Sequence, residues 1–191
     1  MPEQTDLSNI INRSRQGDHK AFAELIRMHQ RYAHDLALRL LLVDNDAREV
    51  TQDAFVRVWQ HLPRYDERVK FTTWLYTIIT NLCLDVLRAR RRKQKLFSPS
   101  TPEHIPDSHD IETLHDNAQL IARIRSLTSR LTEMQRLVFT LRDLQDLSVD
   151  EVREITGMSA NTIKTHLCNA RRSIRSLLQA PHDKERMNDA L

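Results

Sequence analysis

The chain is poor in glycine and in aromatic residues. Its 191 residues include two glycines, Gly17 and Gly157, and only 5% aromatic side chains. Tight β-hairpins depend on Gly and Asn-Gly turns, so this composition disfavours a sheet-rich fold. A glycine-rich nucleotide loop is excluded as well, because the two glycines stand far apart. The composition therefore predicts an all-α fold of one or two domains.

Cysteine is scarce, and long apolar runs are missing. Cys83 and Cys168 are far apart and form no Cys-x-x-Cys pair, so we expect neither a disulfide framework nor a cysteine-rich zinc site. No apolar run approaches the roughly 18 residues of a membrane span. The first residues are polar and lack the apolar core of a secretory signal. We therefore expect no insertion into a membrane and a reducing, cytoplasmic location.

Enzyme motifs are also absent. The sequence has no His-Glu-x-x-His motif, no nucleophile elbow and no paired-carboxylate site, so no catalytic residue is expected. Its nine histidines form no His-x3-His pair, and three of them (His104, His109 and His115) fall in an acidic, proline-containing segment. Such a segment is a poor preformed metal site. We expect no metal, no cofactor and no enzymatic activity.

Positive charge is concentrated in two segments, although the formal net charge is only +3. Basic residues gather at Arg88–Lys95 and at Lys164–Arg175, and acidic residues gather at Glu103–Asp116. Local basic patches favour a polyanionic partner, because each neutralised phosphate releases counterions. This distribution indicates nucleic acid as a ligand.

Residues 148–178 have the pattern of a helix-turn-helix. Ser148 with Glu151 predicts a capping box, and Gly157 suits the left-handed residue that ends a first helix. Ser159 can then cap a second helix, which has a basic outer face. Its inward apolar stripe consists of Ile163, Leu167, Ala170, Ile174 and Leu177. Such an element enters the DNA major groove. The alternative is an ordinary helical hairpin with a solvated basic face.

Further helices follow from capping and apolar spacing. Asp18 predicts the start of a helix that Asp44-Asn45-Asp46 interrupts. Asp46 with Glu49 predicts a capping box for the next helix, which Pro63 ends. Residues 64–70 form a charged loop, and a helix then runs from Phe71 into an arginine run. In the second half of the chain, Thr132 with Gln135 predicts another capping box.

A change of composition divides the chain. Residues 96–117 hold three of the six prolines and five acidic residues, but no Lys or Arg, which is typical of a flexible linker. We therefore predict two helical domains, at 1–95 and 118–180, joined by this acidic, proline-containing linker and followed by a flexible tail at 181–191. The C-terminal domain contains the helix-turn-helix.

Two helices of the first domain have surfaces suited to binding. The stretch 71–92 interleaves aromatic rings with hydroxyl and amide groups and ends in arginines. Aromatic rings stack on unpaired bases while cations bind phosphates, so this stretch favours melted DNA. Alternatively, Trp74 and Tyr76 belong partly to the core. The helix at 46–62 could bind a protein partner or be an ordinary amphipathic core helix.

Taken in order, these blocks resemble the extracytoplasmic-function (ECF) group of the sigma-70 family of bacterial transcription initiation factors. The resemblance covers about residues 8–178. The segments that carry it are Asp46–Trp59, Phe71–Asn81, Leu131–Phe139, Leu144–Ile155 and Asn161–Arg171. It implies a sigma factor that binds core RNA polymerase, directs it to particular promoters and assists DNA opening.

The resemblance also implies partners and site residues. The partners are the β′ clamp helices and β flap of core RNA polymerase, promoter DNA, and an anti-sigma factor that can hold the protein at the inner membrane of a bacterial cell. The implied polymerase-binding residues are Gln52, Asp53, Phe55, Val56 and Trp59. Those for the −10 element are Lys70, Thr72, Thr73, Trp74, Tyr76, Thr77, Asn81, Arg88, Arg90, Arg91 and Arg92. Those for the −35 element are Asn161, Lys164, Thr165, Cys168, Asn169, Arg171 and Arg172.

Two other functions compete with a sigma factor. One is a ligand-responsive helix-turn-helix regulator that acts without binding polymerase, and the other is a sigma mimic that sequesters an anti-sigma factor. The aromatic and arginine-rich stretch at 71–92 disfavours the first. The presence of two DNA-binding surfaces disfavours the second.

Overall fold

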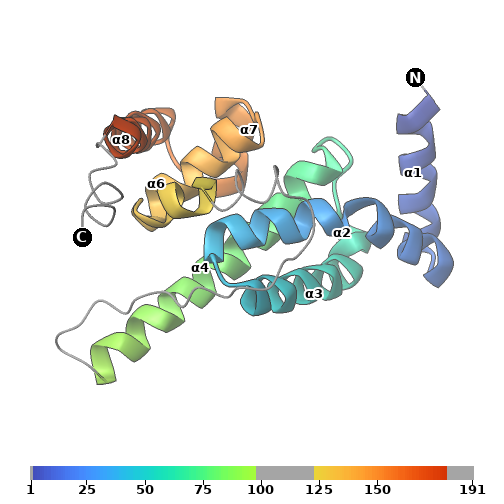
Figure 1. Cartoon of the computed structure of the whole chain (residues 1–191). Helices are drawn as coiled ribbons and strands as arrows, with labels where there is room; N and C mark the ends of the chain where they lie inside the picture. The colour runs from blue at the N-terminus through green and yellow to red at the C-terminus, as the bar shows by residue number, and fades with distance from the viewer. Residues whose placement is uncertain (1, 98–122, 180–191) are drawn as a thin grey trace, which may run out of the picture. The chain divides into compact units, whose positions relative to one another are not determined.

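A computed structural model describes residues 2–97 and 123–179, and every regular element in these ranges is helical (Figure 1). The described residues fall into two compact units, one holding α1 to α4 and the other holding α6 and α8. The all-α prediction is thus confirmed for the described residues. Most of the predicted linker, its three histidines and the predicted tail lie outside them, and the domain boundaries stay a prediction.

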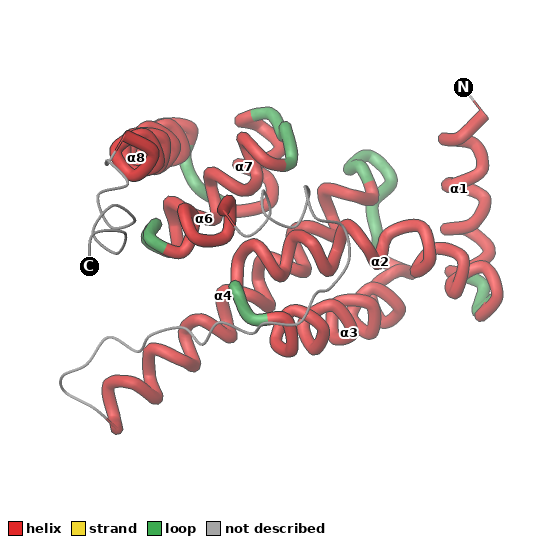
Figure 2. Tube along the Cα trace, viewed as in Figure 1, coloured by secondary structure: helices red, strands yellow, loops and turns green. Residues whose placement is uncertain are grey.

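The first unit is built from helices joined by short loops (Figure 2). α2 packs against α1, α3 and α4, and α3 also packs against α4. Leu25, Leu36, Val58, Leu75 and Ile79 are fully buried, so aliphatic side chains fill the centre of this unit. The elements are α1 (Pro2–Arg15), α2 (His19–Leu41), α3 (Asp44–His61), the short 3-10 helix η1 (Leu62–Arg64) and α4 (Phe71–Phe97).

The turn between α1 and α2 follows from local chemistry, and the predicted start of a helix at Asp18 is confirmed. Gly17 adopts a φ of 88°, which is costly for other residues. Asp18 then caps α2, because its Oδ1 accepts hydrogen bonds from the backbone nitrogens of Lys20 at 2.9 Å and Ala21 at 3.1 Å. These bonds lower the pKa of Asp18, with the bond from Ala21 contributing most.

The start of α3 differs from the sequence prediction. The helix begins at Asp44, and its N-cap is Val43, which makes no side-chain capping bond. Asp44 and Asp46 therefore lie inside the first turn, where carboxylates interact favourably with the helix dipole. The predicted capping box of Asp46 with Glu49 is wrong, and the segment from Asp44 to Asp46 begins a helix instead of separating two.

Residues 123–179 contain the helix-turn-helix. Leu137, Val138, Leu141 and Ile163 are buried, and α6 packs against α8. Residues 123–129 are also helical. The remaining elements are α6 (Glu133–Phe139), the π-helical turn η2 (Thr140–Leu144), α7 (Val149–Thr156) and α8 (Ala160–Gln179).

The predicted caps of the second unit are confirmed. Thr132 and Gln135 form a reciprocal capping box at the start of α6. Glu151 accepts a hydrogen bond from the Ser148 nitrogen at 2.8 Å, and Ser148 Oγ accepts one from the Glu151 nitrogen at 3.2 Å. Gly157 has a φ of 69° in the turn before α8. Such a left-handed residue ends α7 and turns the chain into the next helix.

Candidate nucleic-acid interface

The outer face of α8 is polar and basic, and its inner face is apolar. Of the predicted stripe, Ile163, Leu167 and Ala170 are buried, whereas Ile174 and Leu177 are half-buried. On the other side Asn161, Lys164, Thr165, Cys168, Arg171 and Arg172 are exposed, and Asn169 is half-buried. The N-terminal half of α8 therefore presents hydrogen-bonding side chains of a length suited to base edges.

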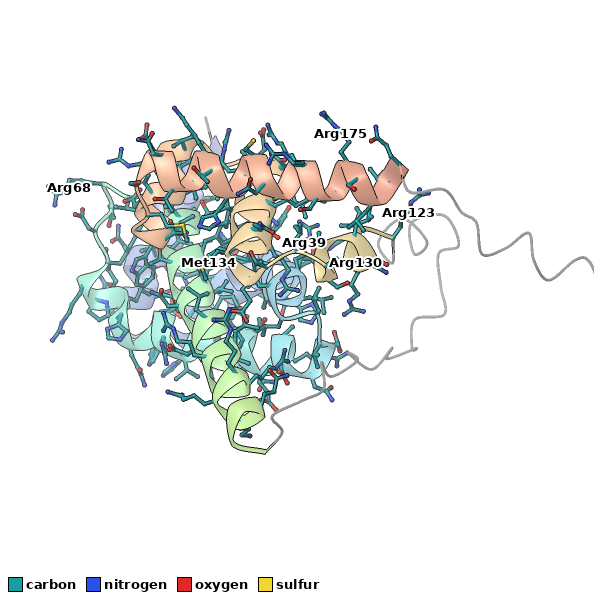
Figure 3. All side chains as sticks on the ribbon, turned by 90° about the vertical axis from the view of Figure 1, so that its left-hand side faces the viewer. Arg39, Arg68, Arg123, Arg130, Met134 and Arg175 are labelled. Atoms are coloured by element: carbon teal, nitrogen blue, oxygen red, sulfur yellow. The ribbon has the colours of Figure 1, made fainter. Side chains whose placement is uncertain are left out.

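Arg171 is already engaged within the second unit. Its Nε and Nη2 donate hydrogen bonds to Asp143 at 2.8 Å and 2.6 Å, and these bonds raise the pKa of the arginine. Asp143 belongs to η2, so the bidentate pair fixes α8 to the π-helical turn. Arg172 is exposed, and Arg175 projects outward from α8 (Figure 3). These two cations are the freer candidates for phosphate contacts.

The first half of α4 is only partly exposed. Lys70, Thr72 and Asn81 are exposed, and Thr77 is half-buried. Thr73 and Tyr76 are buried, with exposed fractions of 2% and 7%. Burial raises the pKa of Tyr76. The exposed side chains at this end of α4 are therefore mostly polar.

Trp74 belongs to a cluster of aromatic rings that the sequence pattern does not reveal. Its ring lies 4.8 Å from that of Tyr65 and 5.8 Å from that of Phe71. His29 of α2 packs edge-on against Phe71 at 4.9 Å, and its Nδ1 is 3.0 Å from the Leu25 carbonyl oxygen. The cluster fixes the start of α4 on α2 and leaves Trp74 half-buried.

The loop before α4 is held from a distance by Arg15. Sequence reasoning treats 64–70 as a charged loop, but Tyr65 is buried, with 8% of its surface exposed. Arg15, at the end of α1, donates hydrogen bonds to the carbonyl oxygens of Leu62 at 3.1 Å and Tyr65 at 2.5 Å, and to Glu67 at 2.5 Å. Helical spacing could not indicate these contacts, because they join residues about fifty positions apart.

The arginine run at the end of α4 has members with different surroundings. Arg88 forms an ion pair with Asp85 on the same helix at 2.8 Å. Arg90 forms an ion pair with Asp46 of α3 and is half-buried. Arg91 and Arg92 are exposed, and this end of α4 extends beyond α2 and α3 (Figure 1). An extended helix end with exposed cations is accessible to a phosphate backbone.

The outer face of α3 presents a second kind of surface. Gln52 and Asp53 are exposed, and Val56 between them on the helix face is 55% exposed. Phe55 is buried, and Trp59 is half-buried beside His19 and Phe22, with ring centroids 5.1 Å and 4.7 Å away. The predicted set thus divides into an exposed face and two aromatic residues that anchor the helix.

Within the described ranges, no three His, Cys, Asp or Glu side chains gather in a metal-binding cluster, and no helix is long and apolar enough to cross a membrane.

Cys83 is buried, and desolvation raises the pKa of its thiol to about 12. This thiol is therefore unreactive at neutral pH.

Two family profiles match the chain. "Sigma-70 region 2" matches residues 25–93, which include most of α2, all of α3 and most of α4. "Sigma-70, region 4" matches residues 121–174, which include α6, α7 and most of α8. The two matches follow the order of the family: the first lies within the unit of α1 to α4, and the second includes α6 and most of α8 of the other unit.

Relatives and solved structures agree with these matches. The ECF RNA polymerase sigma factor SigW of Bacillus subtilis is 27% identical, over 88% of this chain and 95% of that protein. The structure of CnrH in complex with the cytosolic domain of CnrY matches with a TM-score of 0.66 and 23% identity, over 90% and 96% of the two chains.

The sigma factor RpoE, in its complex with the anti-sigma factor NepR from Bartonella quintana, matches with a TM-score of 0.64 and 21% identity, over 84% of this chain and 98% of that one. Because the identities of these two solved structures are low, at 23% and 21%, the structures support the fold of this chain alone. With both sigma-70 regions present in order and a relative matched over nearly its whole length, this chain belongs to the extracytoplasmic-function group of the sigma-70 family.

Proposed function

We propose that this protein is an alternative-promoter sigma factor that binds core RNA polymerase, directs it to a defined set of promoters and assists DNA opening. The observation that supports this most is the presence of both sigma-70 regions, in order, each with an exposed face of the matching chemistry. The protein supplies recognition and no covalent chemistry, so we assign it no catalytic residue and no cofactor.

The first unit would bind polymerase and the melted −10 element. Gln52, Asp53 and Val56 form the exposed face of α3 that would contact the β′ clamp helices. Phe55 and Trp59 would support that face from below. Lys70, Thr72 and Asn81 offer exposed donors and acceptors for unpaired bases.

The other members of the −10 set support this surface or bind the DNA backbone. Trp74, with its half-buried ring, can offer one edge to a base, and Thr77 lies beside it. Thr73 and Tyr76 would support the surface. Arg88, Arg91 and Arg92 would bind phosphates at the extended end of α4, whereas Arg90 would mainly stabilise the fold.

The second unit would read the −35 element as duplex. Lys164, Thr165 and Cys168 lie on the exposed face of α8, where a helix in the major groove meets base edges. Asn161 and Asn169 flank them. Arg172 would bind phosphate, and Arg171 would do so only with the oxygens of Asp143 competing for its donors. The same unit would contact the β flap of polymerase.

Regulation by an anti-sigma factor is part of the proposal. A protein of the same fold is bound to an anti-sigma factor in the Bartonella quintana complex, which supports the same kind of partner for this chain. Because polymerase and promoter DNA are its ligands, we place the protein in the bacterial cytoplasm. An anti-sigma factor located in the inner membrane would hold it there.

The test is transcription in vitro with purified protein, core RNA polymerase and fragmented genomic DNA, followed by sequencing of the transcripts. We expect discrete start sites that share two upstream motifs. Lys164→Ala should weaken discrimination at the −35 motif by about 1–3 kcal/mol. Arg153→Ala is the matched control, because Arg153 is an exposed cation on α7 paired with Asp150.

Failure has a clear signature. Absence of specific transcripts, combined with tight duplex binding by the protein alone, would indicate the ligand-responsive regulator instead. Specific transcripts that are unaffected by Lys164→Ala would leave the sigma function intact and contradict the assignment of the α8 face.

A further inference from the structure

The loop between η1 and α4 owes its conformation to a residue that lies far away in the sequence. The Arg15 guanidinium donates to two main-chain oxygens, at Leu62 and Tyr65, and to the carboxylate of Glu67. It also lies 5.5 Å from the centre of the Tyr65 ring, which is a cation–π distance. One side chain thus fixes both the path and the aromatic residue of this loop.

The contacts inside the loop depend on that arrangement. The Tyr65 hydroxyl donates to the Val69 carbonyl oxygen at 2.5 Å, and the Val69 nitrogen donates to the Asp66 carbonyl oxygen at 3.1 Å. The Tyr65 ring then packs on Trp74, in the first turn of α4. A displacement of Tyr65 would therefore be transmitted to Lys70 and Trp74, which belong to the proposed −10 surface.

We propose that Arg15 is a positioning residue for reading the melted −10 strand: through η1 and the loop at 65–70 it sets the place of Lys70, Thr72 and Trp74. This inference rests on the proposed function and deepens it. It also extends the reading apparatus to α1, which lies outside the residues 25–93 matched by the region 2 profile.

The geometry of arginine is what the position requires. A planar guanidinium can donate along three directions at once, whereas an ammonium group is a compact charge on a flexible stem. The Arg15 side chain is 23% exposed, and its bonds to the two carbonyl oxygens are partly buried, which shields them from competing water, whereas its pair with Glu67 is exposed. Lysine could keep the pair with Glu67 but could not also satisfy both carbonyl oxygens.

The simpler explanation is that Arg15 only stabilises the first unit. The two explanations differ in what a variant loses at temperatures where the unit remains folded. A stabilising residue affects the fraction of folded protein, whereas a positioning residue affects discrimination between −10 sequences by protein that is fully folded.

The experiment compares full-length Arg15→Gln and Arg15→Lys with the wild-type protein and with Arg13→Gln. Arg13 is the matched control, because it lies on the same helix and makes a two-bond ion pair with Asp18, at 3.0 Å and 2.6 Å. The first readout is amide hydrogen exchange. Loss of the Arg15 hydrogen bonds should speed exchange of the Tyr65 and Val69 amides about tenfold. The exchange rates of residues 78–88 of α4 should not change.

The second readout uses holoenzyme assembled with core polymerase on a promoter whose −10 region is held open by mismatches. Transcription from the native −10 strand is divided by transcription from a scrambled strand. We expect this ratio to fall about tenfold in both Arg15 variants, because a tenfold change corresponds to the loss of one or two hydrogen bonds. In Arg13→Gln the ratio should stay at the wild-type value. Affinity for core polymerase should not change.

Each outcome either supports or overturns the proposal. A fall in discrimination together with faster loop exchange supports the proposal. Faster exchange with unchanged discrimination overturns it, since Arg15 would then be a structural residue only. Unchanged exchange overturns it as well. If wild-type holoenzyme itself shows no discrimination, the proposed function fails and this inference fails with it.

Discussion

Arg90 of α4 forms an ion pair with Asp46 of α3 and donates a hydrogen bond to the Leu41 carbonyl oxygen at 3.2 Å. Leu41 is the last residue of α2 and Asp46 lies in the first turn of α3, so one guanidinium joins three helices. The bond also satisfies a carbonyl oxygen that the end of a helix leaves without an intrahelical partner. This arginine therefore stabilises the fold, although it lies in a run whose other members are exposed.

Arg90→Ala is expected to lower the stability of the first unit by about 1–2 kcal/mol, because it removes a half-buried ion pair and a hydrogen bond. The measurement is urea unfolding followed by tryptophan fluorescence, which reports on this unit because Trp59 and Trp74 both lie there. Arg92→Ala is the control and should leave the unfolding curve unchanged while weakening promoter binding. Equal stability of the two variants would contradict the assignment.

Arg171 and Asp143 should behave as a coupled pair. Arg171→Ala and Asp143→Ala are each expected to destabilise the attachment of α8 by about 1 kcal/mol, and the double variant should lose less than the sum. Hydrogen exchange of α8 amides measures the effect. Arg172→Ala should leave exchange unaltered but reduce the slope of log affinity against log salt by about one. An additive double variant would show that the pair is energetically unimportant.

The exposed face of α3 can be tested with a single charge. Val56→Asp should weaken binding to core polymerase at least about tenfold without lowering stability, because an apolar contact would be replaced by an unpaired carboxylate. Fluorescence anisotropy with labelled protein and core enzyme gives the affinity. Met28→Asp is matched for exposure, at 44% against 55%, and should bind normally. Normal binding by Val56→Asp would indicate that core polymerase binds a different surface of the protein.

His29 predicts a dependence of stability on pH. Burial lowers the pKa of its imidazole from the ordinary 6.5 in the folded protein. Below pH 6.5 the unfolded chain therefore binds a proton that the folded chain resists, and stability falls as the pH is lowered through this range. His29→Gln should flatten that part of the profile in urea unfolding at pH 7.5 to 5. His61→Gln, at an exposed site on α3, controls for losing a histidine, and a slope unchanged by His29→Gln would exclude this account.

Local chemistry explains why much of the fold could be predicted from the sequence. The caps at Asp18, Thr132 and Ser148 involve residues two or three positions apart, so each signal is contained in a few letters. The apolar stripe of α8 follows from helical spacing alone. The resemblance to sigma factors likewise depended on ordered short motifs, and the family profiles confirmed it.

Long-range contacts explain what could not be predicted. Asp46 reads as an N-cap, but its partner is Arg90, forty-four positions later. Tyr65 reads as part of a charged loop, but Arg15 and Trp74 bury it. The roles of individual DNA-binding side chains remain predictions, because exposure shows which groups are available and not which base each one meets.

The anchor at Arg15 has an evolutionary consequence. Arg15 donates to the main-chain oxygens of residues 62 and 65. Because every amino acid has a main-chain oxygen, these contacts do not depend on the identity of most side chains in the loop. Arg64 and Arg68 are exposed, and Arg68 projects from the loop (Figure 3). After gene duplication, such residues could diverge and redirect a copy to different genes while the backbone that presents them keeps its shape.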